Sequence, residues 1–365
     1  MSLFARLYRY GFKPVAFRLD PEFVHDHILA FGKILGAHRF SRAAVQKLFV
    51  FSSPMLEQDI LGIHFSNPVG LAAGFDKNAE LTDILPAVGF GFAEVGSVTG
   101  EPCAGNPKQR LWRLPKSQAL VVNYGLKNDG AGAIARRLAG RVFGIPLGIS
   151  IAKTNSPDTV PTKAGIADYV KAYRSFVGIG SYTTINISCP NAFGGQPFTE
   201  PASLDALLAE IDGIPTRKPV FVKLSPDLAE PQLEALIAVL NRHTVHGIVC
   251  TNLTNHRANL NIKDAVVPAV GGLSGKVVEP LANRLIAYMY RCTQGKYVIV
   301  GCGGVFTAAD AYKKIRLGAS LIQMITGMVY QGPQVIGEIN QGLVKLLRVD
   351  GFSNVSEAIG ADNKL

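Results

Sequence analysis

The segment Asn186-Ile187-Ser188-Cys189-Pro190-Asn191 places a proton-transferring side chain between two amides. The preceding Tyr182-Thr183-Thr184-Ile185 is aromatic and β-branched, as in a buried strand, and Pro190 disfavours helical backbone at Cys189. These features predict a loop at the C-terminal end of a strand, where loops often carry chemistry. A thiol near cationic groups can be partly ionised at neutral pH and act as a base. For an isolated cysteine, a buried structural role in a turn is the alternative.

Two lysines are candidates for binding anions. Lys77 and Lys223 follow or lie within apolar strands, where a charge is costly unless it meets an anion. A structural salt bridge is the alternative for each, with Asp76 and Asp227 as the nearby acidic residues. Side-chain amides suited to a planar ring with carbonyl and N–H edges are those of Asn123, Asn186, Asn191 and Asn252. Together these residues predict an anionic cofactor and an anionic substrate.

Glycines end two later apolar runs, in Gly301-Cys302-Gly303-Gly304 and Thr326-Gly327. Glycine lets backbone N–H groups approach an anion, so a phosphate site is predicted, with a tight turn as the alternative. The chain has no GxxxxGK[ST] motif and no GxSxG motif. Its five cysteines form no CxxC pair and have no histidine at metal-ligand spacing, which argues against a structural zinc site and favours a reducing compartment.

The elements that must position these residues alternate between strands and helices. The pattern predicts a (β/α)₈ TIM barrel, ahead of a doubly wound sheet. The expected strands are 68–74, 92–98, 147–153, 182–188, 219–225, 246–252, 297–303 and 320–326. The expected helices include 163–178, 203–212, 229–242, 278–292, 307–317 and 333–347. We expect a small hairpin around Val121-Val122 within 99–146, a long loop over 253–277 and a mobile segment at 190–202.

Polar residues recur at the ends of the expected strands. In a barrel of this kind, the active site lies at the C-terminal ends of the strands. The third expected strand, for example, ends in Ser150-Ile151-Ala152-Lys153, and the sixth ends in Thr251-Asn252. The strand ends therefore predict one shared site.

The N-terminus has an interfacial composition. Residues 2–12 are expected to form a cationic amphipathic helix that stops at Gly11 and Pro14. A second helix begins with Asp20 as its N-cap and runs to about Gly36, with Phe23, His27 and Phe31 on one face. We expect residues 1–45 to form a helical hairpin that contacts a membrane, and residues 46–365 to form the barrel domain. A helix pair merely packed on the barrel is the alternative.

Composition limits the class of protein. The 365 residues, 48% of them hydrophobic, can bury one large α/β core with an appendage. No apolar run approaches the roughly 20 residues of a membrane span, and no signal peptide is expected. The net charge of +10 fits nucleic acid, an anionic membrane surface or acidic small molecules.

Several motifs in order resemble those of the dihydroorotate dehydrogenases. The helical extension and the Gly271-Gly272-Leu273-Ser274-Gly275 loop resemble the quinone-dependent, membrane-associated class 2 enzymes. The other matching motifs are Leu71-Ala72-Ala73-Gly74-Phe75-Asp76-Lys77-Asn78, Val95-Gly96-Ser97-Val98-Thr99, Asn186-Ile187-Ser188-Cys189-Pro190-Asn191, Val222-Lys223-Leu224-Ser225-Pro226-Asp227 and Thr251-Asn252. The similarity extends from the N-terminal hairpin to about residue 348.

The resemblance implies FMN as the cofactor and no metal. It implies that Cys189 is the base that removes the C5 proton of dihydroorotate, and that Lys223 stabilises reduced flavin. The implied FMN contacts are Ala73, Gly74, Lys77, Ser97, Ser150, Asn186, Lys223, Thr251, Gly275, Gly304, Ile325 and Thr326. The implied substrate contacts are Lys77, Asn123, Gly125, Leu126, Asn186, Asn191, Asn252 and Leu253.

Some positions depart from the class 2 pattern. Class 2 enzymes usually have serine as the base, whereas Cys189 is typical of class 1. Ser150 replaces an asparagine, Leu253 a threonine and Ile325 an aromatic residue. The Asn123-Tyr124-Gly125 segment is one residue shorter than the usual Asn-x-x-Gly.

The expected function is oxidation of dihydroorotate to orotate in pyrimidine biosynthesis, with FMN accepting hydride and a quinone accepting the electrons. The expected partners are therefore dihydroorotate and orotate, a membrane quinone and an anionic membrane surface, without nucleic acid. We expect a peripheral protein on the cytoplasmic side of the cell membrane. The alternatives are an FMN barrel acting on another uracil-type ring or a tRNA base, a dihydroorotate dehydrogenase with a soluble acceptor, and a degenerate, non-enzymatic binding module.

Overall fold

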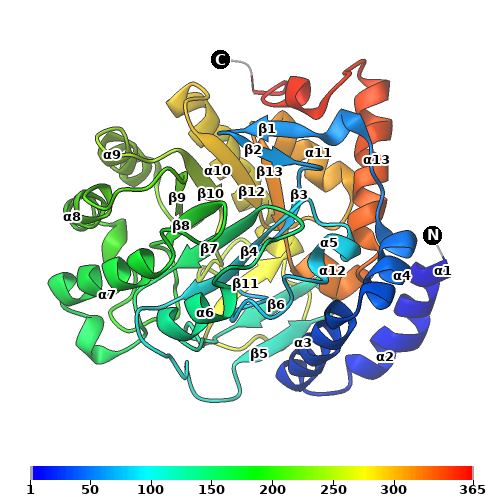
Figure 1. Cartoon of the computed structure of the whole chain (residues 1–365), viewed down its shortest axis with the longest axis horizontal. Coiled ribbons are helices and arrows are strands. Elements are labelled where there is room, and N and C mark those ends of the chain that lie inside the picture. Colours follow the sequence, from blue (N-terminus) through cyan, green and yellow to red (C-terminus); the bar gives the residue numbers. More distant parts are fainter. Residues whose placement is uncertain (1–2, 364–365) are drawn as a thin grey trace.

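Eight parallel strands close into a barrel in the computed structural model, which describes residues 3–363 (Figure 1). The predicted (β/α)₈ barrel is confirmed, and every strand lies within its predicted range. The barrel strands are β3 (Val69–Leu71), β4 (Phe92–Val98), β7 (Leu147–Ile151), β8 (Tyr182–Asn186), β9 (Val220–Lys223), β10 (Gly247–Cys250), β12 (Val298–Cys302) and β13 (Leu321–Met324). Most strands end earlier than predicted, so the polar residues after them belong to loops.

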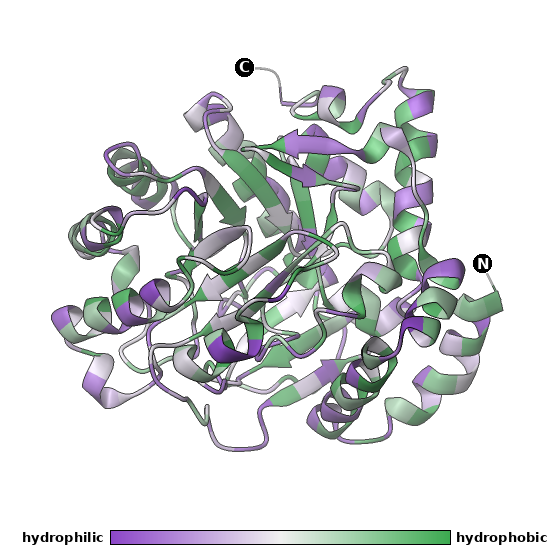
Figure 2. Ribbon diagram, viewed as in Figure 1, coloured by the Kyte–Doolittle hydropathy of each residue, from purple (hydrophilic) through white to green (hydrophobic). Residues whose placement is uncertain are grey.

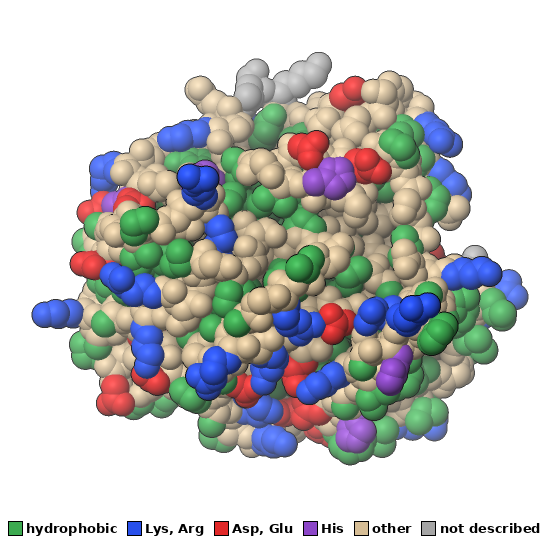
Figure 3. Space-filling model, viewed as in Figure 1, with side chains coloured by type: hydrophobic (Ala, Val, Ile, Leu, Met, Phe, Trp, Pro, Cys, Tyr) green, Lys and Arg blue, Asp and Glu red, His purple; other side chains and the backbone are tan. Residues whose placement is uncertain are grey.

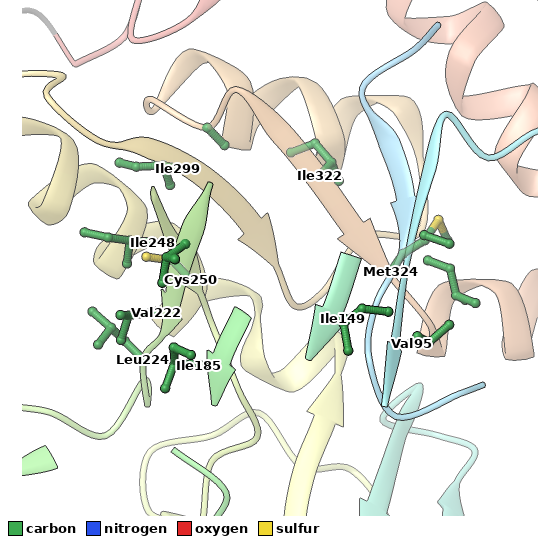
Figure 4. Packing of buried hydrophobic residues seen from close by; sticks show 14 of the residues in the cluster. Val95, Ile149, Ile185, Val222, Leu224, Ile248, Cys250, Ile299, Ile322 and Met324 are labelled. Atoms are coloured by element: carbon green, nitrogen blue, oxygen red, sulfur yellow. The ribbon is translucent and has the colours of Figure 1, made fainter. Parts of the chain in front are cut away.

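Helices surround the barrel and cover the outward-facing side chains of its strands. These helices are α5 (Leu85–Val88), α6 (Ala131–Leu138), α7 (Thr162–Ser175), α8 (Pro201–Asp212), α9 (Glu230–Leu240), α10 (Glu279–Thr293), α11 (Ala308–Arg316), α12 (Thr326–Gln331) and α13 (Val335–Val349). Val95, Ile149, Val222 and Ile299 are fully buried in the layer between strands and helices (Figure 4). Each such side chain contributes about 1.5–3 kcal/mol by burial, so this layer stabilises the barrel that carries the loops.

Aromatic side chains fill the barrel at the N-terminal ends of its strands. Strands β1 (Gln58–Ile60) and β2 (Ile63–Phe65) form a hairpin there. The Phe65 and Phe92 rings meet edge to face with centroids 5.5 Å apart, and Tyr182 stacks on Phe221 at 5.1 Å. Since this end is packed with side chains, a ligand can enter the barrel only at the opposite end.

A three-stranded antiparallel sheet lies beside the barrel. It contains the predicted hairpin, β5 (Leu111–Leu114) and β6 (Ala119–Val122), and a third strand, β11 (Gly272–Gly275). The prediction that 253–277 is a loop throughout was therefore wrong over β11. The Gly-Leu-Ser-Gly sequence is typical of a turn, but Leu273 is fully buried and pairs with Val121.

The N-terminal extension contains more helix than predicted. Its helices are α1 (Leu3–Arg6), a π-helical segment (Leu7–Phe12), α2 (Lys13–Ala16), α3 (Pro21–Ala37) and α4 (Arg39–Phe49). The predicted stop at Gly11 and Pro14 was wrong, because the π-helical segment widens the backbone where Lys13 N–H bonds to Tyr8 O, immediately before Pro14. The predicted N-cap is confirmed: the Asp20 carboxylate accepts from Phe23 N–H at 2.8 Å. Residue 2, the predicted first residue, lies outside the described residues.

A buried ion pair attaches the extension to the barrel domain. Glu22 on α3 and Arg110, just before β5, are each about 5% exposed or less, and Glu22 Oε1 lies 2.7 Å from Arg110 Nη2. The hydrogen bonds from Arg110 keep the pKa of Glu22 below its usual value although burial acts to raise it. The predicted domain boundary at residue 45 falls within α4 and stays a prediction. Among residues 3–363, no helix is long and apolar enough to cross a membrane.

Candidate active site

A cavity of about 650 Å³ lies at the C-terminal end of the barrel and continues to the N-terminal helices. This volume is in the range of cofactor and ligand sites. Most of the predicted site residues line it: Ala73, Gly74, Lys77, Ser97, Gly125, Leu126, Asn186, Cys189, Asn191, Lys223, Thr251, Asn252, Leu253, Gly275, Gly304, Ile325 and Thr326. Ser150 and Asn123 do not line it.

Ser150 lies behind the wall of the cavity. Its hydroxyl is 2.8 Å from Ser97 Oγ, which also accepts from Asn186 Nδ2 at 2.8 Å. Asn186 Oδ1 in turn accepts from Asn252 Nδ2 at 3.0 Å. Serine is shorter than the asparagine usual at this position, so Ser150 orients Ser97 rather than reaching the cavity. Its predicted direct flavin contact is therefore not supported.

Asn123 belongs to a neighbouring cavity of about 480 Å³, which also contains Asn106, Asn191 and Arg257. Its Oδ1 accepts from Asn106 Nδ2 at 3.0 Å. The connection after Asn123 is one residue shorter than in the family pattern, and Tyr124 occupies the main cavity instead. The predicted direct substrate contact of Asn123 is therefore not supported.

Lys77 lies among aromatic rings, and no carboxylate within the described part of the chain forms an ion pair with it. Its Nζ is 3.9 Å from the centroid of Tyr124 and 3.5 Å from His25 Nε2. Burial, followed by repulsion from Lys127, lowers the pKa of Lys77 to about 8, and burial together with Lys77 lowers that of His25 well below its usual value. The Asp76 carboxylate accepts the N–H groups of Glu80 and Leu81, each at 2.8 Å, so the predicted alternative of a salt bridge to Asp76 is not found.

Lys223 ends β9 and is 5% exposed, and it lines the cavity. Among residues 3–363, its ammonium forms no hydrogen bond and no ion pair. Asp227 instead accepts from the Thr254 hydroxyl and, at 2.9 Å, from Asn255 N–H. A buried, unpaired charge is costly, so this ammonium calls for an acceptor supplied by a ligand.

The glycines after β12 form a cradle for an anion. Gly303 and Gly304 have positive φ values of +114° and +78°, and their N–H groups have no acceptor within the described part of the chain. A Cβ on Gly304 would lie 2.3 Å from Glu279 Cβ, so no other residue fits without a shift. Beside this loop, Ser274 Oγ is 2.9 Å from Thr326 Oγ1. Free N–H groups and hydroxyls suit the phosphate of a nucleotide cofactor.

Cys189 is half-buried at the edge of the cavity. Burial raises the pKa of its thiol to about 11, and the Asn191 N–H, Lys153 and Lys223 offset only part of this effect. This direction is opposite to the predicted one, because desolvation outweighs the nearby cations. Proton abstraction from a bound ligand requires the minor thiolate form.

The dihydroorotate dehydrogenase family model matches residues 55–347. This chain is 40% identical to the dihydroorotate dehydrogenase (quinone) of Roseiflexus sp. (strain RS-1), over 95% of this chain and 96% of the relative. It is 36% identical to that of Trichodesmium erythraeum, over 98% and 99%. The crystal structure of DHODH from Eimeria tenella in complex with ferulenol aligns with a TM-score of 0.85 and 29% identity, covering 95% of this chain and 96% of that one.

The chain belongs to the dihydroorotate dehydrogenase family. Its relatives in the quinone class cover the N-terminal extension as well as the barrel, which confirms the predicted class 2 resemblance. No cluster of His, Cys, Asp or Glu among residues 3–363 could hold a metal ion.

The part of the cavity next to α1–α3 is apolar, with a few polar residues. The guanidinium of Arg113 lies 4.7 Å from the Phe17 ring, and its Nη1 donates to Leu19 O at 2.9 Å. Tyr330 donates to Ala119 O at 2.8 Å. The cavity thus changes from polar at the strand ends to apolar at the helices.

Two polar or aromatic residues beside Lys77, His25 and Tyr124, are among the cavity residues that sequence reasoning missed. The α3 residues that line the cavity include Val24, His25, Ile28 and Phe31. Of the predicted face, Phe31 therefore reaches the cavity, whereas Phe23 is exposed and does not. Spacing of i, i+3 and i+4 within α3 could have indicated His25, but the choice between faces depends on the barrel. Nothing in the sequence places Tyr124 under Lys77.

Proposed function

We propose that this chain oxidises dihydroorotate to orotate with FMN as the hydride acceptor and a quinone as the final electron acceptor, in pyrimidine biosynthesis. The observation that carries the proposal is the single cavity, which has unpaired cations and free N–H groups at one end and an apolar channel at the other. A reaction between a charged substrate and an apolar acceptor needs both environments in contact with one redox cofactor.

The residues present fit FMN. Gly303, Gly304 and Thr326 would hold its phosphate, and Ser97 and Asn186 would bind the polar edge of the ring. When bound, FMN accepts a hydride and passes electrons on singly or in pairs. Lys223 supplies a fixed positive charge that stabilises the reduced, anionic ring more than the oxidised one.

Dihydroorotate fits the polar end of the cavity. Lys77 would bind its carboxylate, and Asn186, Asn191 and Asn252 would bind the carbonyl and N–H edges of its ring. Cys189 Sγ would take the C5 proton. Leu253, in place of the usual threonine, can offer only apolar and backbone contacts.

The outer surface of the extension supports docking on an anionic membrane. Figure 2 shows hydrophobic residues along the N-terminal helices, and Figure 3 shows Lys and Arg side chains beside hydrophobic ones at that edge of the molecule. Exposed apolar residues of the extension that do not line the cavity are Leu3, Leu7, Tyr10, Val15, Leu19, Phe23, Ile34 and Phe40. This composition is typical of interfacial helices, and it would bring a membrane quinone to the apolar channel. We place the protein at the cytoplasmic side of the cell membrane.

Anaerobic mixing of the purified full-length protein with dihydroorotate tests the reaction. The flavin absorbance should bleach and should return on addition of a short-chain quinone, but not of a water-soluble acceptor such as fumarate. Protein that contains no flavin and takes up no FMN, or flavin that does not bleach, would refute the proposal.

Two neighbouring positions on α3 test the quinone channel. Val24 lines the cavity, whereas Phe23 is exposed and does not line it. Val24→Trp should therefore lower quinone turnover while the rate of flavin reduction stays unchanged, and Phe23→Trp should leave both unchanged. Equal effects of the two variants on quinone turnover would contradict a quinone channel on this side of the cavity.

A further inference from the structure

Lys153 is a buried cation that the proposed reaction has not used. It lies just after β7 and is 3% exposed. No carboxylate among residues 3–363 forms an ion pair with it: the nearby Asp168 instead accepts from Thr154 N–H at 2.6 Å and Gly100 N–H at 3.2 Å. Burial lowers the pKa of Lys153, which shows that its charge is incompletely balanced.

The ammonium of Lys153 holds the loop that carries Cys189. Its Nζ donates to Phe193 O at 2.8 Å and lies 3.4 Å from Thr159 Oγ1. The N–H of Phe193 donates to Asn155 Oδ1 at 2.7 Å. Both backbone polar groups of Phe193 are thus bound by side chains that follow β7, which fixes this loop four residues after Cys189.

Lys153 and Cys189 also interact electrostatically, and each favours the charged form of the other. The other groups that act on the thiol are Lys223, Cys103 and the Asn191 N–H, and Cys189 in turn acts on the Tyr169 phenol. Three lysines near the cavity, Lys77, Lys153 and Lys223, form no ion pair within the described residues. In the proposed function, the substrate carboxylate would balance Lys77 and the flavin Lys223. Lys153 feels the charge of Asp168, which forms no ion pair with it within the described residues, and would gain a second anion when the base ionises.

We propose that Lys153 is a positioning residue for Cys189: its ammonium anchors the catalytic loop and supplies the positive charge against which the thiolate forms. This inference rests on the proposed function for its relevance to catalysis, but the properties of the thiol can be measured without substrate. In the reaction, the C5 proton passes to Cys189 Sγ and Lys153 stays protonated throughout.

The test compares Lys153→Gln, which keeps a hydrogen-bond donor but removes the charge, with Lys153→Met, which removes both. Purified full-length protein is treated with iodoacetamide at several pH values, and labelling of the Cys189 peptide is followed by mass spectrometry. The exposed Cys292 serves as the internal control. A nearby positive charge lowers the pKa of a thiol by about 1–3 units. At pH values below the midpoint of the labelling curve, Cys189 should therefore be labelled about tenfold or more slowly in Lys153→Gln than in the parent.

The outcomes separate the two roles of Lys153. If it only anchors the loop, Lys153→Gln labels at the parental rate and the inference is overturned. Lys153→Arg should restore the labelling rate, and in stopped-flow experiments the loss in Lys153→Gln should appear in kcat for flavin reduction rather than in KM. If Lys153→Met does not fold, the comparison of the Gln and Arg variants still tests whether the charge of Lys153 acts on Cys189. Failure of dihydroorotate to bleach the parent flavin would refute the proposed function and leave the labelling result intact.

Discussion

The raised pKa of Cys189 predicts a steep pH dependence of flavin reduction. Burial moves the pKa of this thiol from an ordinary value of 9.0 to about 11. At pH 8, about three units below, only about one thiol in a thousand is ionised. If the thiolate is the base, the rate of flavin reduction by saturating dihydroorotate should rise about tenfold per pH unit from about pH 7 to pH 10.

Anaerobic stopped-flow mixing measures this rate directly from the flavin absorbance. Cys189→Ala should bind flavin, but its flavin should be reduced orders of magnitude more slowly than that of the parent. Its rate should also not rise with pH. Cys189→Ser should need a still higher pH for the same rate, because a hydroxyl is a weaker acid. Cys292→Ser, which changes an exposed cysteine on α10, is the matched control and should retain the parental profile.

The same shift limits the usable pH range. Because folding raises the pKa of Cys189, the protonated thiol favours the folded state, and this contribution is complete below about pH 9 and is lost as the pH rises toward 11. Thermal melting at each pH should therefore accompany the kinetics. A parental rate that is flat over this range, or that levels off near pH 7, would refute the argument from burial.

Three further predictions concern the cavity and the extension. Gly304→Ala should abolish flavin retention, because the new Cβ would lie 2.3 Å from Glu279 Cβ. Gly178→Ala is the control and should retain flavin, because a Cβ there meets no atom within 4 Å. Flavin absorbance after gel filtration measures retention in both variants. Lys223→Met should raise the melting temperature of flavin-free protein by removing an unpaired charge, yet slow flavin reduction about a hundredfold or more; a lower melting temperature would indicate a hidden partner. Glu22→Gln should cost about 3–5 kcal/mol in denaturant unfolding because it leaves its buried cationic partner unpaired, and an unchanged midpoint would contradict a buried pair.

The barrel was predictable because its evidence is local and repeated. Each strand is a short apolar run followed by polar or glycine residues, and each helix has its own periodicity. The failures concern backbone that depends on distant partners. Strand β11 exists because Leu273 pairs with Val121, far away in the sequence, and the helix through Pro14 continues because a π-helical segment precedes it. The helix α4 was not predicted either.

The candidate site was predictable where motifs follow strands, and less so where side-chain direction decides. Ser97, Asn186 and Lys223 reach the cavity because inward-facing positions at strand ends are fixed by the alternation of a strand. Ser150 is buried behind Ser97, and Asn123 is turned into a second cavity by a shortened connection. Neither outcome follows from residue type. The pKa of Cys189 depends on desolvation, which only the tertiary structure determines.

Cys189, the proposed base, and the helical extension suggested different classes, and they are held by different parts of the molecule. The extension is attached through Glu22 to Arg110 and through the Tyr8 hydroxyl to Val329 O at 2.7 Å. The loop that carries Cys189 is instead held from β6 and the segment after β7: Asn191 Nδ2 donates to Val122 O at 2.8 Å, and Lys153 binds the carbonyl of Phe193. The identity of the base can therefore change without altering the channel to the quinone. It follows that variants in the channel should leave the pH profile of flavin reduction unchanged, and that variants of Lys153 should leave quinone access unchanged.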